Sequence, residues 1–153
     1  MALEAPATPI NPAPTMANQT PENASIAQTG QKILVETDYF KAVIDTAGGD
    51  LRSVQLKKHG AMEDPKVPFT LLQDGGEHLY IARTGFLGDV LPSHRQIFTS
   101  AKTAYTLGAA QNTLEVRLDT EVSGVKVAKI FVFHKDSYLI DVRYELQNQS
   151  AVT

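Results

Sequence analysis

Apolar and polar residues alternate with a period of two in several segments after residue 32, which is typical of β-strands with one buried face. The clearest alternation places Leu114, Val116 and Leu118 between charged residues. A second alternating segment extends from Tyr138 to Leu146. Both segments predict strands that turn one face to a core and the other to solvent.

Between these two segments, residues 125–133 are nearly continuous in apolar character and rich in β-branched and aromatic side chains. Such a composition is typical of a strand that is covered on both faces. The polar residues 134–137 follow it directly and predict a turn into the strand that starts at Tyr138.

The first half of the domain predicts a hairpin. Residues 40–44 alternate, and residues 51–56 are again extended in character. Between them lie Gly48, Gly49 and Asp50, and a glycine pair accepts the positive φ angles that tight turns require. We therefore predict a structural turn at these three residues.

Weaker signals predict a short pair of strands at 69–72 and 79–81, around a glycine-containing turn, and a further strand within 97–107. No window of 11 residues carries the apolar stripe of a capped helix. The pattern predicts an all-β fold, an antiparallel β-sandwich of about eight strands.

Residues 1–31 differ from the rest in composition. They hold five of the eight prolines, many Ala and Thr residues, and only Glu4 and Glu22 as charged residues. Such a segment buries too little apolar surface to offset the entropy of ordering its backbone. We predict a disordered Pro/Ala/Thr-rich linker over 1–31 and one domain over 32–153.

Composition excludes several classes of function. The 14 Lys and Arg residues against 17 Asp and Glu residues give a net charge of −3, which argues against a nucleic-acid partner. The absence of cysteine excludes disulfides, thiolate nucleophiles and cysteine metal sites. The longest apolar runs fall far below the roughly 18 residues that span a bilayer, and residues 1–4 lack the features of a secretory signal.

The residues that could carry chemistry are scattered. The four histidines, at positions 59, 78, 94 and 134, lack the spacing of a local metal pair. Asp74, Glu77 and Asp89 lie in glycine-containing loops, where a carboxylate pair for sugar chemistry is possible but ordinary turn residues are the simpler interpretation. We predict no catalytic, cofactor-binding or metal-ligating residue.

One stretch is locally basic. Lys57 and Lys58 are adjacent, and Lys66 follows in the same loop region. They form a possible partner-contact loop for anionic lipid headgroups or for an acidic protein surface. A simple solvated loop is the alternative.

Five segments in order along the chain carry a resemblance to a known family. They are 40–51 (FKAVIDTAGGDL), 68–72 (PFTLL), 80–85 (YIARTG), 129–133 (KIFVF) and 136–142 (DSYLIDV). In their order and spacing they resemble the large periplasmic domain of the YidC membrane protein insertases of Gram-negative bacteria.

The resemblance implies a β-supersandwich, similar to sugar-binding and mutarotase-like domains, at the periplasmic face of the Gram-negative inner membrane. It implies tethering by membrane helices outside this chain, and an accessory role in inserting and folding inner-membrane proteins, alone or with the Sec translocon. The expected partners are SecF-like and SecY-like translocon components and nascent membrane proteins. No catalytic residue and no cofactor is implied.

The family domain is longer than residues 32–153, so these residues are expected to be its N-terminal portion, truncated at the C-terminal end. Two other functions stay open. One is a free-standing carbohydrate-binding or mutarotase-like sandwich, and the other is a periplasmic chaperone that adds extended peptides to an exposed strand edge.

Overall fold

The computed structural model describes residues 30–75, 79–86, 93 and 95–149, and these form eight strands and no helix. The strands are β1 (Lys32–Glu36), β2 (Phe40–Asp45), β3 (Asp50–Gly60), β4 (Pro68–Leu72), β5 (Ala104–Thr106), β6 (Thr113–Val122), β7 (Val125–His134) and β8 (Ile140–Asn148). Nothing in this described part is a helix long and apolar enough to cross a membrane. The predicted linker falls outside the described residues except for its last two.

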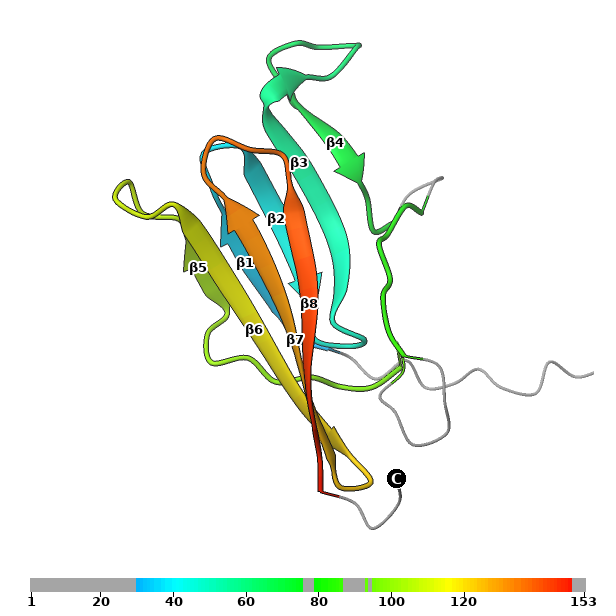
Figure 1. Cartoon of the computed structure of the whole chain (residues 1–153). Helices are drawn as coiled ribbons and strands as arrows, with labels where there is room; N and C mark the ends of the chain where they lie inside the picture. The colour runs from blue at the N-terminus through cyan, green and yellow to red at the C-terminus, as the bar shows by residue number, and fades with distance from the viewer. Residues whose placement is uncertain (1–29, 76–78, 87–92, 94, 150–153) are drawn as a thin grey trace, which may run out of the picture.

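Two sheets pack face to face (Figure 1), so the predicted all-β sandwich is confirmed. The larger sheet has the order β4-β3-β2-β1-β5, and the smaller has the order β6-β7-β8. All strand pairs are antiparallel except β1 and β5, which pair in parallel over three residues. The long connection between β4 and β5 permits this exception, because a parallel pair needs a crossover rather than a tight turn.

The strand predicted within 97–107 is present only as the short β5, and the strand predicted at 79–81 is replaced by a single bridge. Within 97–107 only β5 is a strand, because Ile97 bridges to the first sheet at Ala47 while Thr99 bridges to the second at Asp119. A segment that crosses between sheets cannot continue one ladder. Likewise, residues 79–81 form no strand, and Tyr80 makes one bridge to Gln73.

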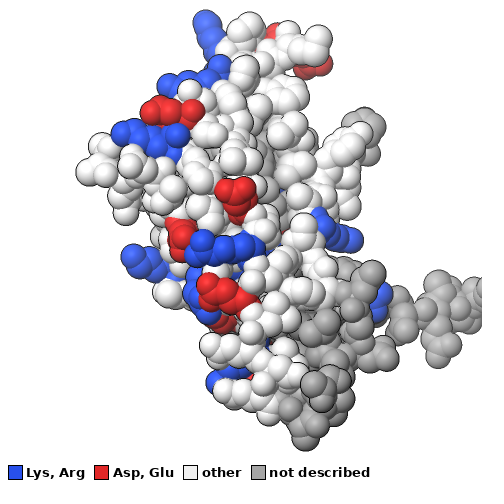
Figure 2. All heavy atoms as spheres, viewed as in Figure 1, with Lys and Arg blue, Asp and Glu red and all other residues white. Residues whose placement is uncertain are grey.

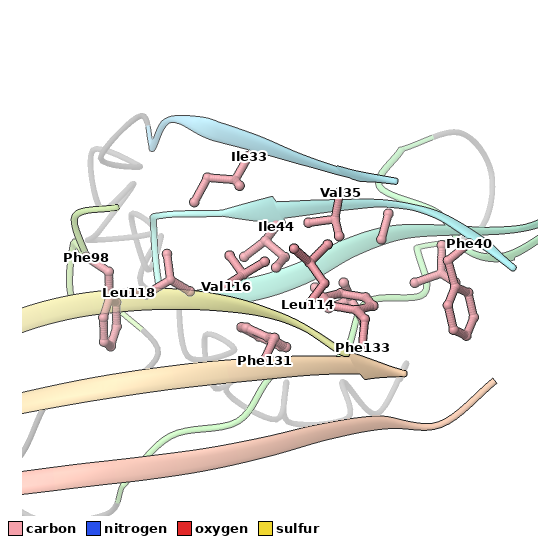
Figure 3. Close-up of a cluster of buried hydrophobic side chains, with 13 residues drawn as sticks. Ile33, Val35, Phe40, Ile44, Phe98, Leu114, Val116, Leu118, Phe131 and Phe133 are labelled. Atoms are coloured by element: carbon pink, nitrogen blue, oxygen red, sulfur yellow. The ribbon is translucent and has the colours of Figure 1, made fainter. Parts of the chain in front are cut away.

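The core lies between the two sheets and is built from the alternating residues of the sequence pattern (Figure 3). Every second residue of β6 from Leu114 to Leu118 is buried, as predicted. Phe133 of β7 is fully buried, and its ring meets that of Phe40 edge to face at 6.3 Å. Each such large side chain contributes about 1.5–3 kcal/mol by leaving water.

The middle strand β7 is buried on its outer face too, as its apolar run predicted. Ala128, Ile130 and Val132 are at most 8% exposed there. Ion pairs between β6 and β8 cross over this strand, one from Arg117 to Glu145 at 2.6 Å and one from Arg143 to Glu115 at 3.0 Å. Figure 2 shows these opposite charges side by side over the smaller sheet. Long charged side chains can lay their aliphatic stems along apolar surface while their charged ends stay in water, which suits the burial of this strip.

The sandwich is open on one side. The smaller sheet ends at β8 where the larger one continues through β3 to β4 (Figure 1). Apolar side chains are exposed on both edge strands, among them Val142 and Leu146 of β8 and Leu71 of β4, at 38%, 46% and 54%. Residues 80–86 run along this side and close part of it.

Candidate functional site

Residues 80–86, called the strap below, connect the two sheets on the open side of the sandwich. Ala82 exchanges two backbone hydrogen bonds with Leu51 of β3, at 3.0 and 3.1 Å. The Thr84 hydroxyl lies 2.7 Å from the Tyr144 hydroxyl of β8. The ring of Phe86 meets that of Tyr144 edge to face at 4.6 Å. The strap is therefore bonded to one sheet at its middle and to the other at its end.

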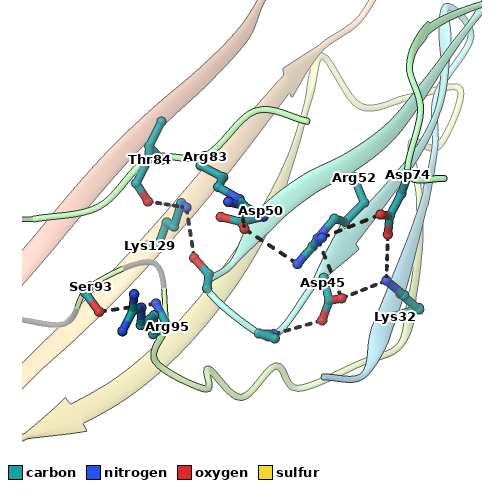
Figure 4. A network of polar contacts seen from close by, with 12 residues as sticks. Lys32, Asp45, Asp50, Arg52, Asp74, Arg83, Thr84, Ser93, Arg95 and Lys129 are labelled. Carbon is teal, nitrogen blue, oxygen red and sulfur yellow. Dashed lines mark hydrogen bonds and ion pairs between the residues drawn. The ribbon is translucent and has the colours of Figure 1, made fainter. Parts of the chain in front are cut away.

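Lys129 of β7 lies beneath the strap and is fully buried, although it is a lysine. Its Nζ donates to the Thr84 carbonyl at 3.0 Å and to the Gly48 carbonyl at 3.4 Å (Figure 4). It also lies 5.4 Å from the ring centre of Phe131 and 5.8 Å from that of Tyr144. One ammonium group thus joins β7, the β2–β3 turn and the strap.

Asp50 supplies the negative charge of this site. Its side chain is 2% exposed and forms ion pairs with Arg83 of the strap at 3.3 Å and with Arg52 at 3.7 Å. Arg52 also pairs with Asp45 and Asp74 (Figure 4). Acidic and basic side chains alternate in this cluster, so each buried charge lies near a charge of opposite sign. Such pairing offsets the cost of removing charges from water.

The glycine pair shapes the site as well as the turn. Gly48 and Gly49 have φ angles of 78° and 59°, and Asp50 starts β3 immediately afterwards. A Cβ atom on Gly49 would lie 3.1 Å from Cδ of Lys129. Glycine is needed here both for the left-handed backbone and for the close passage of the lysine stem.

Burial dominates the electrostatics of the two ionisable groups under the strap. It lowers the pKa of Lys129 from 10.5 to about 8, against the attraction of Asp50, which raises it. Burial also raises the pKa of Tyr144, although the hydrogen bond with Thr84 opposes this. Charge on Lys129 therefore costs free energy as long as the strap encloses it.

The predicted contact loop lies at the far end of the molecule. We call residues 57–67 the tip, because the β3–β4 hairpin extends there beyond the sandwich (Figure 1). Lys57 is bound to the end of β1. Its Nζ donates to the Glu36 carboxylate at 3.1 Å and to the Thr37 carbonyl at 2.8 Å. All three lysines are exposed, and the Nζ of Lys58 lies 5.7 Å from the ring centre of Tyr39. The structure thus separates Lys57, whose ammonium group is hydrogen-bonded to a neighbouring strand, from Lys58 and Lys66, which remain accessible to a partner.

The tip has a defined backbone. Ala61 donates to the Val67 carbonyl at 2.8 Å, and the Asp64 side chain accepts a hydrogen bond from the Lys66 amide at 2.9 Å. Gly60 lies so close to Pro65 that a Cβ atom would meet its carbonyl oxygen at 2.4 Å. This backbone presents Met62 with 97% of its surface exposed.

The remaining candidates lie apart from one another. The ring of His59 lies 5.2 Å from that of Tyr138 in a tilted arrangement, whereas His134 lies 2.7 Å from Asp141. Asp74 is engaged by Lys32 and Arg52. Glu77, Asp89 and the histidines at 78 and 94 lie outside the described residues. Within the described ranges, no three His, Asp or Glu side chains gather as metal ligands would.

The sequence pattern did not single out Lys129 as a site residue. A signal for it exists, because Val127, Phe131 and Phe133 share its side of the strand and are all buried. A single charged residue at an inward position of an apolar strand predicts a buried charge. Which groups surround that charge depends on turns and loops that the strand pattern does not locate.

Comparison with known proteins agrees with the resemblance. The family model described as "YidC periplasmic domain" matches residues 32–153. The chain is similar to "Membrane protein insertase YidC" of Nitrosospira multiformis, with 41% identity over 93% of the chain and 27% of that protein. It is also similar to the proteins of that name from Laribacter hongkongensis, at 45% over 94% of the chain and 28% of the relative, and from Methylobacillus flagellatus, at 46% over 80% and 23%. The chain thus spans about a quarter of the length of these curated relatives.

Proposed function

Because residues 32–153 belong to the YidC periplasmic domain family, we propose that they form a periplasmic accessory domain of a membrane protein insertase. The domain works through contacts with other proteins while inner-membrane proteins are inserted and folded. It lies at the periplasmic face of the Gram-negative inner membrane, held there by membrane helices outside this chain. The observation that carries the proposal is the family match over the entire sandwich.

The proposed role is one of contact rather than catalysis. The most prominent charged groups inside the sandwich, Lys129 and Asp50, are enclosed and bonded to the protein itself. The accessible cations, Lys58 and Lys66, lie at the tip beside the exposed Met62. Exposed positive charge next to an exposed apolar side chain suits the rim of a protein interface.

We assign the tip to partner contact, with SecF-like or SecY-like translocon components or nascent membrane proteins as the partners. The experiment places a photo-crosslinking amino acid at position 58, 62 or 66 of the chain within its full-length protein in inner membranes. Position 126 is the matched control. Lys126 is also an exposed lysine, but it lies in the smaller sheet, at the end that points away from the tip. Crosslinks to Sec subunits or nascent chains from the tip positions, and not from position 126, are expected.

Reversal of the tip charge provides the second arm of this experiment. The double variant Lys58→Glu, Lys66→Glu is expected to reduce these crosslinks from position 62, since it removes both accessible cations without touching the core. If the tip positions capture neither class of partner, or if position 126 captures them equally well, the assignment of the tip is wrong.

The open side supports a second statement about the same domain. We propose that residues 32–153 are the N-terminal portion of a larger sandwich, in which a further strand pairs with β8. Strand β8 is the last of its sheet, and its side chains Val142 and Leu146 are exposed beside it. An unpaired edge flanked by apolar side chains favours addition of a strand.

This statement is tested by lengthening the chain. A chain extended beyond residue 153 is expected to bind less hydrophobic dye and to unfold at a higher urea concentration than residues 1–153 alone. Cooperative unfolding of residues 1–153 as a monomer that binds no dye would contradict the proposal.

A further inference from the structure

We propose that the strap opens as a unit while the two sheets stay folded, that Tyr144 holds it closed, and that the protonation state of the enclosed Lys129 sets how often it opens. This inference rests on the contacts of the strap and is independent of the proposed function. The strap lies on the open side, next to the edge strand β8 (Figure 1), so opening exposes more of the inner face of the smaller sheet.

The strap is attached mainly by polar contacts. Residues 82–85 are exposed. On the side of the larger sheet, the contacts of the described residues include two backbone bonds of Ala82 with Leu51, two of Tyr80 with Gln73, and the ion pair of Arg83 with Asp50. On the smaller sheet, among the described residues, they are those of Thr84 and Phe86 with Lys129 and Tyr144. A segment with few buried apolar contacts and exposed backbone is the kind that opens before the core does.

The charge of Lys129 makes this opening dependent on protonation. Opening returns the ammonium group to water and so recovers its hydration. The groups that face Lys129 are Asp50 of β3, with its partners Arg52 and Arg83, and Tyr144 of β8. Aspartate, arginine and tyrosine side chains ordinarily titrate outside pH 7–9, so Lys129 is the group of this site that changes charge there.

The size of the effect follows from the two pKa values of Lys129. With the strap closed the pKa is about 8, and after opening it returns towards 10.5. The open form therefore binds more protons in this interval, and raising the pH favours the closed form. By linkage, the open fraction falls about tenfold between pH 7 and pH 9.

Trypsin measures the opening, because the bond after Arg83 lies within the strap. A protease needs several extended residues, so cleavage there follows the open fraction. The rate in the 153-residue chain is measured at pH 7 and pH 9 by mass spectrometry and divided by the rate for a free peptide of the strap sequence. We expect a fall of about tenfold. The bonds after Arg117 and Arg143, at the middle of β6 and β8, are expected to stay intact meanwhile.

Tyr144→Phe is the variant that loosens the strap without removing the lysine. It deletes the hydroxyl that bonds Thr84, and we expect cleavage after Arg83 to rise roughly threefold to tenfold, the range for one net hydrogen bond. Tyr105→Phe is the matched control, since its hydroxyl bonds Ser100 at 2.8 Å, away from the strap. Lys129→Met is expected to remove the dependence on pH.

Three results would overturn the inference. Cleavage after Arg83 that always accompanies cleavage after Arg117 and Arg143 would mean global unfolding. If the cleavage rates, divided by those of the free peptide, are equal at pH 7 and pH 9 in the native chain, the charge of Lys129 does not control the opening. Equal cleavage rates after Arg83 in Tyr144→Phe and Tyr105→Phe would show that the Tyr144 hydroxyl does not hold the strap closed. If Lys129→Met fails to fold, the native pH series and the tyrosine pair still decide.

Discussion

Both ends of the larger sheet carry several basic side chains, but the two groups differ in their burial and in the segments that supply them. At the strap end, cations from β3, β7 and the strap surround one buried carboxylate, Asp50. At the tip, Lys58 and Lys66 come from a single hairpin and are exposed to water. Charge that distant segments bring together is enclosed in the fold, whereas the charge at the tip is exposed and can meet a partner.

The largest expected effect comes from removing the central negative charge. Asp50→Asn keeps the shape of the side chain but leaves Lys129, Arg83 and Arg52 without their buried counterion. We expect the free energy of unfolding to fall by about 3 kcal/mol, as for other broken buried ion pairs. Urea unfolding followed by circular dichroism measures it.

The same chemical change at the tip is the control. Asp64→Asn retains an oxygen that can accept the hydrogen bond from the Lys66 amide, and its surroundings are exposed. A change within about 0.5 kcal/mol is expected there. If both substitutions cost the same, the contrast between the two ends is wrong.

Lys129 should make the stability rise with pH between pH 7 and pH 9.5. Folded Lys129 loses its proton near pH 8, whereas an unfolded lysine keeps it to about 10.5. The unfolded chain therefore binds more protons in between, and increasing pH favours folding. Between pH 7 and pH 9.5 the gain is about 2 kcal/mol by linkage. This range lies below the titration of Tyr144 and Tyr138, whose pKa values are raised.

Lys129→Met separates this effect from all other titrations. Methionine fills a similar volume without charge, so we expect a small change in stability at pH 7 and no rise towards pH 9.5. Lys58→Met, at the tip, should keep the full rise. A pH-dependent gain that persists in Lys129→Met would assign it to another group.

Gly49→Ala tests the backbone that brings these groups together. It places a Cβ atom in the left-handed region, at φ 59°, and 3.1 Å from the stem of Lys129. We expect a loss of about 1–2 kcal/mol in the free energy of unfolding. Gly108→Ala is the matched control, because its Cβ would meet only the flexible end of Gln111. Equal losses would show that the glycine is not required by the site.

Much of the fold could be predicted from the sequence because sandwich strands carry their burial in a two-residue period. Leu114, Val116 and Leu118 show it directly, and the structure places all three in the core. The prediction failed where the chain leaves a sheet, as at Ile97 and Tyr80, since single bridges impose no periodic pattern. The parallel pairing of β1 with β5 was missed because alternation within a strand does not show the direction of its partner, and this ladder covers only three residues.

The cluster of charged side chains beneath the strap could not be predicted, because its members are distant in sequence. Lys129 and Thr84 are 45 residues apart, and Lys129 and Gly48 are 81 apart. The two-residue period places Lys129 on the inner face but does not locate the carbonyls that accept its bonds. At the tip, by contrast, Lys58 and Lys66 are close in sequence and exposed, so composition alone indicated a basic loop.

The smallest expected effect concerns a third group of charges, the ion pairs over β7. Arg117 and Glu145 lie 2.6 Å apart, as close as any pair at the strap end, but both side chains are about half exposed. Water and salt screen such a pair, so distance alone does not set its strength. We expect a coupling of about 0.5 kcal/mol from a double-mutant cycle with alanine at both positions.

The cycle is needed because Arg117→Ala alone removes more than a charge. Arg117 lies opposite Ile130 in the register of β6 and β7, and Ile130 is 1% exposed, so we expect the single substitution also to uncover apolar surface. The cycle cancels that loss and leaves the pairwise coupling. In 1 M salt the coupling should vanish, whereas the cost of Asp50→Asn should largely persist because Asp50 is buried. A coupling above about 2 kcal/mol would mean that exposed pairs on this sheet stabilise the fold as much as buried ones do. Burial would then not explain the difference between the two ends of the larger sheet.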